Sequence, residues 1–88
     1  MRTLEAFYDV LNSTPPELKK LIDFSFAIAN VIDARLKELN ITQKELAART
    51  GCKEPEIAKW LGRTHNFTIK TLAKISVALG IDLIKIED

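Results

Sequence analysis

The stretch TQKELAARTGCKEPEIAKWL, residues 42–61, constrains the fold more than any other part of the chain. Thr42 can cap a helix N-terminus, and Glu45, three residues later, completes the pattern of a capping box. Gly51 suits the left-handed conformation of a tight turn, because glycine has no Cβ to clash there. Pro55 fixes its own φ and disfavours a helical conformation in the residue before it, so a second helix should begin at or beside Pro55. The stretch therefore predicts two short helices joined by a tight turn.

Apolar residues at helical spacing predict further helices on both sides of this pair. A short amphipathic helix is expected over residues 4–12. A long helix is expected up to about residue 39, with Thr14 as its N-cap and Asn40 ending it. Another is expected from Thr68, as its N-cap, to Gly80. The isoleucine-rich tail alternates weakly and predicts a short strand over residues 82–87, which would need a second copy of the chain as its partner.

These elements describe an all-α, compact four- to five-helix domain with a short C-terminal strand. The chain has 88 residues and is 47% hydrophobic and 28% charged, so we expect one globular domain with a small core, to which a dimer interface would add stability. We divide it into an N-terminal helical extension (1–23), a central domain (24–82) and a C-terminal strand or tail (83–88).

The composition also excludes several classes of protein. Cys52 is the lone cysteine, and no uninterrupted apolar span is long enough to cross a membrane, so we expect a cytoplasmic protein without membrane contact. One cysteine and one histidine cannot form a zinc site. The sequence has no glycine-rich phosphate loop, and we expect neither an enzyme nor a cofactor or small-molecule substrate.

The charges are unevenly distributed along the chain. Residues 40–80 hold seven basic and three acidic side chains, whereas residues 1–39 hold five and six, and residues 81–88 hold one and three. A basic segment between acidic flanks indicates a surface for a polyanion. The alternative is an ordinary solvated surface on which the charges cluster by chance.

Two short helices joined through Gly51 are typical of a helix-turn-helix, whose second helix enters the DNA major groove. The segments TQKELAARTG, IAKWL and FTIKTLAKISVALGIDL resemble the lambda-repressor-like or XRE family of DNA-binding domains over roughly residues 25–82. In this resemblance Gly51 makes the turn, while a small residue at the helix crossing and apolar residues on the second helix form the core of the motif. These core positions are Leu46, Ala47, Ile57 and Trp60.

The resemblance implies a role for each residue that faces DNA. The residues that would face base edges are Glu54, Pro55, Glu56 and Lys59, and those that would lie on phosphates are Gln43, Lys44, Lys53, Arg63, Thr64, His65 and Asn66. The chain departs from the family at two places. The serine or glutamine common at the start of the reading helix is replaced by the run KEPE at residues 53–56. The family glycine after this helix usually comes one residue later than Gly62.

Several of these residues have a second interpretation. Glu54 or Glu56 can accept a hydrogen bond from the N4 amine of cytosine, or can stabilise the helix N-terminus through its dipole without touching a base. Lys59 can contact DNA or be a solvated surface lysine. Trp60 can fill the core or stack on a base, and His65 can bind phosphate or bond to the backbone of its own turn.

The sequence thus leads to three hypotheses about function. The first is a transcriptional regulator, repressor-like, that binds double-stranded DNA as a homodimer. The second is an antitoxin that binds a toxin protein and regulates its own operon, favoured by the apolar N-terminal segment LEAFYDVL. The third is a helix-turn-helix scaffold that has lost its affinity for DNA, because acidic residues lie close to the reading helix.

Overall fold

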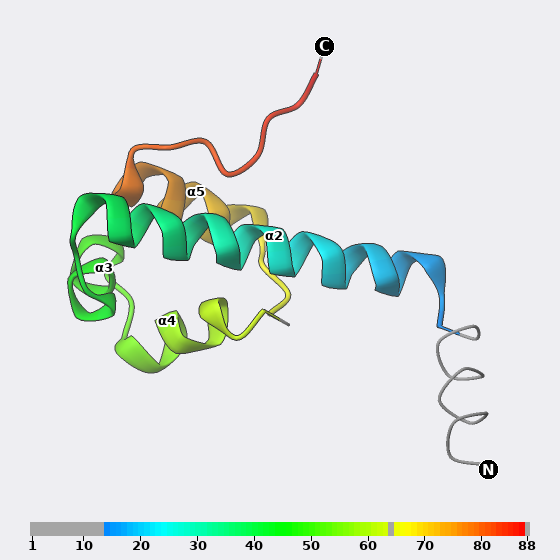
Figure 1. Cartoon of the computed structure of the whole chain (residues 1–88), viewed down its shortest axis with the longest axis horizontal. Coiled ribbons are helices and arrows are strands. Elements are labelled where there is room, and N and C mark those ends of the chain that lie inside the picture. Colours follow the sequence, from blue (N-terminus) through cyan, green and yellow to red (C-terminus); the bar gives the residue numbers. More distant parts are fainter. Residues whose placement is uncertain (1–13, 64, 88) are drawn as a thin grey trace.

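The computed structural model describes residues 14–63 and 65–87, and this part of the chain contains four helices (Figure 1). They are α2 (Pro16–Leu39), α3 (Gln43–Thr50), α4 (Glu54–Leu61) and α5 (Ile69–Leu79). The all-α prediction is confirmed. The helix expected over residues 4–12 lies outside the described residues.

The long helix α2 runs without interruption across the expected boundary at residue 23. Its N-cap is Pro15, in an extended conformation and without a side-chain capping bond, so the prediction of Thr14 as the cap is wrong. Pro16 occupies the first helical position, where a missing N–H costs nothing, and a proline before it already holds the extended conformation that a cap requires. At the other end Asn40 adopts the left-handed conformation, with φ of 54°, and ends the helix as predicted.

All four helices contribute to one small core. Its largest side chain is that of Trp60, which is 1% exposed and packs in a cluster with residues from α2, α3 and α5. The buried members of the cluster are Ile32, Leu36, Leu46, Ala47, Ile57, Trp60, Ile75 and Leu79. In Figure 1, α2 crosses the molecule with α4 on one side of it and the C-terminal tail on the other.

One apolar stripe follows the whole of α2, and only part of it is covered. Its residues alternate steps of four and three, which keeps them on one helix face: Leu18, Ile22, Ser25, Ala29, Ile32 and Leu36. The C-terminal half of the stripe is buried in the core, whereas Leu18 and Ile22 remain 44% and 39% exposed. The N-terminal half of α2 projects beyond the other helices and also exposes Phe24 and Phe26 (Figure 1).

The tail after α5 contains no strand within the described residues, so the strand predicted over 82–87 is not formed in the single chain, and its pairing with a second copy stays a prediction. Ile81 and Leu83 are partly buried against the core, and the Leu83 N–H donates to the Ser76 hydroxyl at 3.2 Å. Packing against the core therefore involves only the first residues of the tail, and residues 84–87 are exposed. Ile84 and Ile86 are exposed. None of the helices described here is long and apolar enough to cross a membrane.

Candidate nucleic-acid interface

The turn between α3 and α4 forms as the sequence predicts. The Thr42 hydroxyl accepts a hydrogen bond from the Glu45 N–H at 3.2 Å, which caps α3. The carboxylate of Glu45 forms an ion pair with Arg49 at 3.3 Å. The predicted capping box is therefore formed only through the Thr42 hydroxyl, and the Glu45 side chain takes no part in it. Gly51 has φ of 74°, and its N–H bonds to the Ala47 carbonyl. The two short helices are thus fixed at their junction by backbone geometry that favours glycine.

The helix α4 presents one face to the core and the other to solvent. Ile57 and Trp60 are buried at 0% and 1% exposure, so Trp60 is a core residue. Glu54, Pro55, Glu56, Ala58 and Lys59 are all exposed. Within the described part of the chain, no ion pair engages the charged residues of this exposed face. The base-facing set predicted from the sequence, Glu54, Pro55, Glu56 and Lys59, is therefore exposed, with Glu54 and Glu56 on different sides of the helix.

The N-terminus of α4 has no side-chain cap. Lys53 is the N-cap residue, with an extended backbone and no capping hydrogen bond from its side chain, and Glu54 and Glu56 lie in the first turn. Two carboxylates at this end of a helix interact favourably with its dipole. Both glutamates can thus stabilise the helix without contacting DNA.

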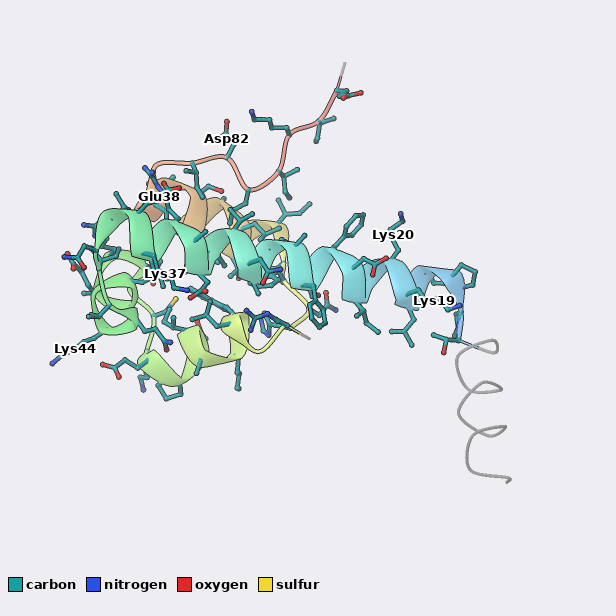
Figure 2. All side chains as sticks on the ribbon, viewed as in Figure 1. Lys19, Lys20, Lys37, Glu38, Lys44 and Asp82 are labelled. Carbon is teal, nitrogen blue, oxygen red and sulfur yellow. The ribbon has the colours of Figure 1, made fainter. Side chains whose placement is uncertain are left out.

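An exposed glutamine and two exposed lysines flank this face on the side of α3. Gln43 and Lys44 are exposed at the start of α3, and Lys53 is exposed at the start of α4. Figure 2 shows Lys44 projecting away from the body of the molecule on the side of α2 where α4 lies, with Glu38 and Asp82 on the opposite side. A polyanion would therefore meet cations beside α4 rather than these acids.

The loop after α4 adopts an unusual backbone at Arg63. Gly62 has an ordinary φ of −72°, whereas Arg63 has φ of 69°, in the region that favours glycine. The left-handed residue thus comes one position after Gly62, where the family usually has its glycine. The Arg63 guanidinium donates from Nε to the Asn30 side-chain oxygen at 3.2 Å and from Nη1 to the Leu61 carbonyl at 3.3 Å.

The rest of the loop is held partly by α2. The His65 ring meets the Phe67 ring edge-on, with centroids 4.8 Å apart, and the His65 carbonyl accepts a hydrogen bond from the Ser25 hydroxyl at 2.7 Å. Asn66 is exposed, and Thr64 lies outside the described residues. Two of the predicted phosphate-facing residues, Arg63 and His65, are thus hydrogen-bonded to α2. Gln43 and Lys44, by contrast, lie at the start of α3.

Sequence reasoning did not identify Ser25 and Asn30 as residues of this region. Their partners lie 40 and 33 positions away in the chain, so no local pattern reveals the bonds. One signal was present for Ser25, because it is a polar residue within the apolar stripe of α2. A hydroxyl at 2% exposure requires a hydrogen-bond partner, and its presence in the stripe indicates one.

Among the described residues, no group of three or more His, Cys, Asp or Glu side chains is arranged to hold a metal ion. The exposed surface of α4 and its neighbours offers hydrogen-bond donors, acceptors and positive charge. Such a surface is suited to recognition of a polyanion by contact.

A family model for helix-turn-helix proteins matches residues 32–86, which is more than half of the chain. The match begins in the second half of α2 and includes α3, α4 and α5. Comparison with curated proteins and with solved structures found no match. The chain therefore belongs to the XRE family of helix-turn-helix proteins, a DNA-binding rather than an enzymatic family.

Proposed function

We propose that this helix-turn-helix protein is a sequence-specific transcriptional regulator that acts as a repressor, with α4 lying in the major groove of its operator. The observation that carries the proposal is the division of α4 into two faces. Ile57 and Trp60 are buried, while Pro55, Glu56 and Lys59 are exposed. The protein would bind its operator in the cytoplasm of a bacterium or of a phage-infected cell.

Base recognition is assigned to the exposed face of α4. Lys59 would donate to an acceptor on a base edge, and Glu54 or Glu56 would accept from the N4 amine of cytosine, a contact worth about 1–3 kcal/mol of discrimination. Pro55 would contribute apolar contact in the groove. This arrangement replaces the amide contacts common in the family with carboxylate contacts, so the preferred operator should contain cytosine opposite the start of α4.

Attraction to phosphates is assigned to residues on both sides of α4. The set is Gln43, Lys44, Lys53, Arg63, Thr64, His65 and Asn66. Lys44, Lys53 and Arg63, together with Lys59 on α4, give four cations. If about four phosphates are neutralised, the logarithm of the binding constant should fall against the logarithm of salt with a slope of roughly −3 to −4 per subunit. The helix dipole of α3 adds to this attraction at Gln43.

The test of this function is fluorescence anisotropy with random duplex at low salt, followed by selection of bound duplexes from a random library. We expect binding at micromolar protein and an enriched motif. Lys59→Ala should weaken binding and relax the motif. Lys85→Ala is the matched control, because Lys85 belongs to the tail after α5, and Figure 1 shows this tail on the other side of α2 from α4. Absence of any binding by the unaltered protein would refute the proposal.

We further propose that the protein binds DNA as a homodimer through the exposed part of the α2 stripe. This part centres near Ile22, while α4 packs beneath Ile32 and Leu36. At a rise of 1.5 Å per residue, the two places are about 15–20 Å apart along α2. Two chains that meet near Ile22 with their α2 helices antiparallel would separate their α4 helices by about 30–40 Å, which includes the 34–36 Å between half-sites one turn apart.

Light scattering after size exclusion tests the dimer, with Ile22→Glu as the disruptive variant and Ile86→Glu as the control. Ile86 is 85% exposed in the tail, so the same change there introduces the same charge away from α2. Ile22→Glu should give a monomer with weakened operator binding, and Ile86→Glu should remain a dimer. A monomeric unaltered protein at high concentration would overturn this part of the proposal.

The exposed apolar residues on the projecting half of α2 favour a second candidate function, in which the protein is an antitoxin that holds a toxin. Leu18, Phe24 and Phe26 are exposed on the projecting half of α2. Phe24 also lines an apolar pocket of about 270 Å³ together with Phe67 and Leu83. Exposed apolar patches of this kind mark protein interfaces. Co-expression with the product of the adjacent gene tests this candidate. A lack of any toxin-like neighbour, or a complex unaffected by Phe26→Glu, would count against it.

A further inference from the structure

Ser25 is the one buried polar side chain in the described core, and it lies where α2 meets the loop after α4. Its hydroxyl is 2.8 Å from the Leu21 carbonyl in its own helix and 2.7 Å from the His65 carbonyl. A hydroxyl has a single proton, so the two carbonyls share it. No other described donor is directed at the His65 carbonyl, which makes Ser25 the group that holds this part of the loop to α2.

Asn30 makes a second attachment about one and a half turns further along α2. Its side-chain oxygen accepts from the Nε of Arg63 at 3.2 Å, and the Leu61 carbonyl accepts from Nη1 at 3.3 Å. A guanidinium has five N–H donors in a fixed plane, so these two bonds orient it and leave three donors for another acceptor. Both bonds hold Arg63 in a left-handed backbone conformation that an arginine rarely adopts alone.

We propose that Ser25 and Asn30 are positioning residues that hold the loop after α4, and the guanidinium of Arg63 in particular, in the orientation that binds a DNA phosphate. The inference rests on the proposed DNA-binding function. Planar guanidinium groups suit the bidentate recognition of phosphate, and a side chain oriented before binding loses less entropy when it binds. Neither α2 residue is within the part of the chain matched by the family, which begins at residue 32.

The two attachments differ in what they do for stability. The bond between Asn30 and Arg63 is exposed to solvent, so its removal should change the stability of the fold little. Removal of the Ser25 hydroxyl leaves the His65 carbonyl without its partner. A role in positioning therefore predicts that Asn30→Ala lowers DNA affinity while the melting temperature stays nearly constant.

The test is a double-mutant cycle of Asn30→Ala and Arg63→Ala, measured as binding to one duplex over a range of salt. Arg63→Ala should reduce the steepness of the log–log salt dependence by about 0.9, the value for one phosphate contact. Asn30→Ala keeps the charge of Arg63, so it should weaken binding about three- to tenfold with an unchanged slope. In the Arg63→Ala background, Asn30→Ala should have no further effect. This non-additivity is the signature of a residue that acts through another.

Ser25→Ala gives an independent readout. Amide exchange in the loop after His65 should accelerate, and affinity should fall, whereas exchange in α3 should stay as it was. An Asn30→Ala protein that binds as tightly as the unaltered one, or that loses the same factor with and without Arg63, would overturn the inference. An Arg63→Ala protein with full affinity would also overturn it and leave the proposed function standing. If the unaltered protein binds no duplex, both fail.

Discussion

The left-handed backbone of Arg63 predicts that a glycine and an alanine at this position have different effects on stability. Arg63 has φ of 69°, a conformation that costs a residue with a Cβ roughly 1–2 kcal/mol. Its side chain offsets this cost with hydrogen bonds to Asn30 and Leu61, worth about 0.5–1.5 kcal/mol each and less where they are exposed. Arg63→Gly removes the cost and the bonds together, so its net effect on the free energy of unfolding should be close to zero.

Arg63→Ala removes the same bonds and keeps the cost. We expect it to be less stable than Arg63→Gly by about 1 kcal/mol, which corresponds to a difference of roughly 4–8 °C in melting temperature for a domain of this size. Urea unfolding followed by the fluorescence of Trp60, the single tryptophan and a buried one, measures the difference directly. The slopes of the two unfolding curves should agree, because the surface exposed on unfolding is nearly the same.

DNA binding provides the internal control for this pair. Both variants lose the same guanidinium, so both should lose the same phosphate contact and show the same change in salt dependence. Equal stability of the alanine and glycine variants would show that residue 63 is not left-handed in solution. The register of the loop relative to the family glycine would then be wrong.

Four other positions give testable predictions. Gly51→Ala should cost about 1 kcal/mol in urea unfolding, and only through its φ of 74°, because a Cβ there has no heavy atom within 4 Å. Thr42→Ala should cost about 1 kcal/mol through loss of the α3 cap, and Thr42→Ser should restore it in the same assay. Ile57→Ala should cost about 2–5 kcal/mol, since the side chain is fully buried. Glu56→Gln should lower stability by about 0.3–1 kcal/mol if the carboxylate only supports the helix dipole, and should alter the selected operator if it reads cytosine.

The sequence predicted those parts of the fold that depend on neighbouring residues. The cap at Thr42 and the turn at Gly51 each follow from backbone preferences within a few residues. The helix α4 begins next to Pro55 as predicted, but it includes Glu54, although the residue before a proline disfavours the helical conformation. The start of α2 was misplaced by one residue, because a threonine cap and a proline pair favour adjacent positions and the prolines prevail. The tail was assigned to a strand from its alternation, which shows neither whether a partner strand is present nor which of its residues pack against the core.

The candidate interface was predictable only in part, for a related reason. Exposure of one face of α4 follows from the helical period, which places Ile57 and Trp60 on the opposite face. The hydrogen bonds of the loop to Ser25 and Asn30 join residues far apart in the chain, so no periodic pattern in the sequence predicts them. The apolar stripe of α2 was visible in the sequence, but its pattern is the same in the half that the core covers and in the half that it leaves exposed.

This continuity of the stripe has a consequence for DNA binding. Ser25 lies between the exposed Ile22 and the buried Ala29 on the same face of α2, and its hydroxyl holds the His65 carbonyl. Any protein that covers Ile22 and Phe26 therefore rests within one helical turn of the bond that attaches the loop. A second copy or a partner on this surface would stabilise the segment of α2 from which Ser25 and Asn30 project. The surface proposed for association and the loop proposed for phosphate contact are thus joined by one helix, and a variant of the stripe should be examined for both activities in the same preparation.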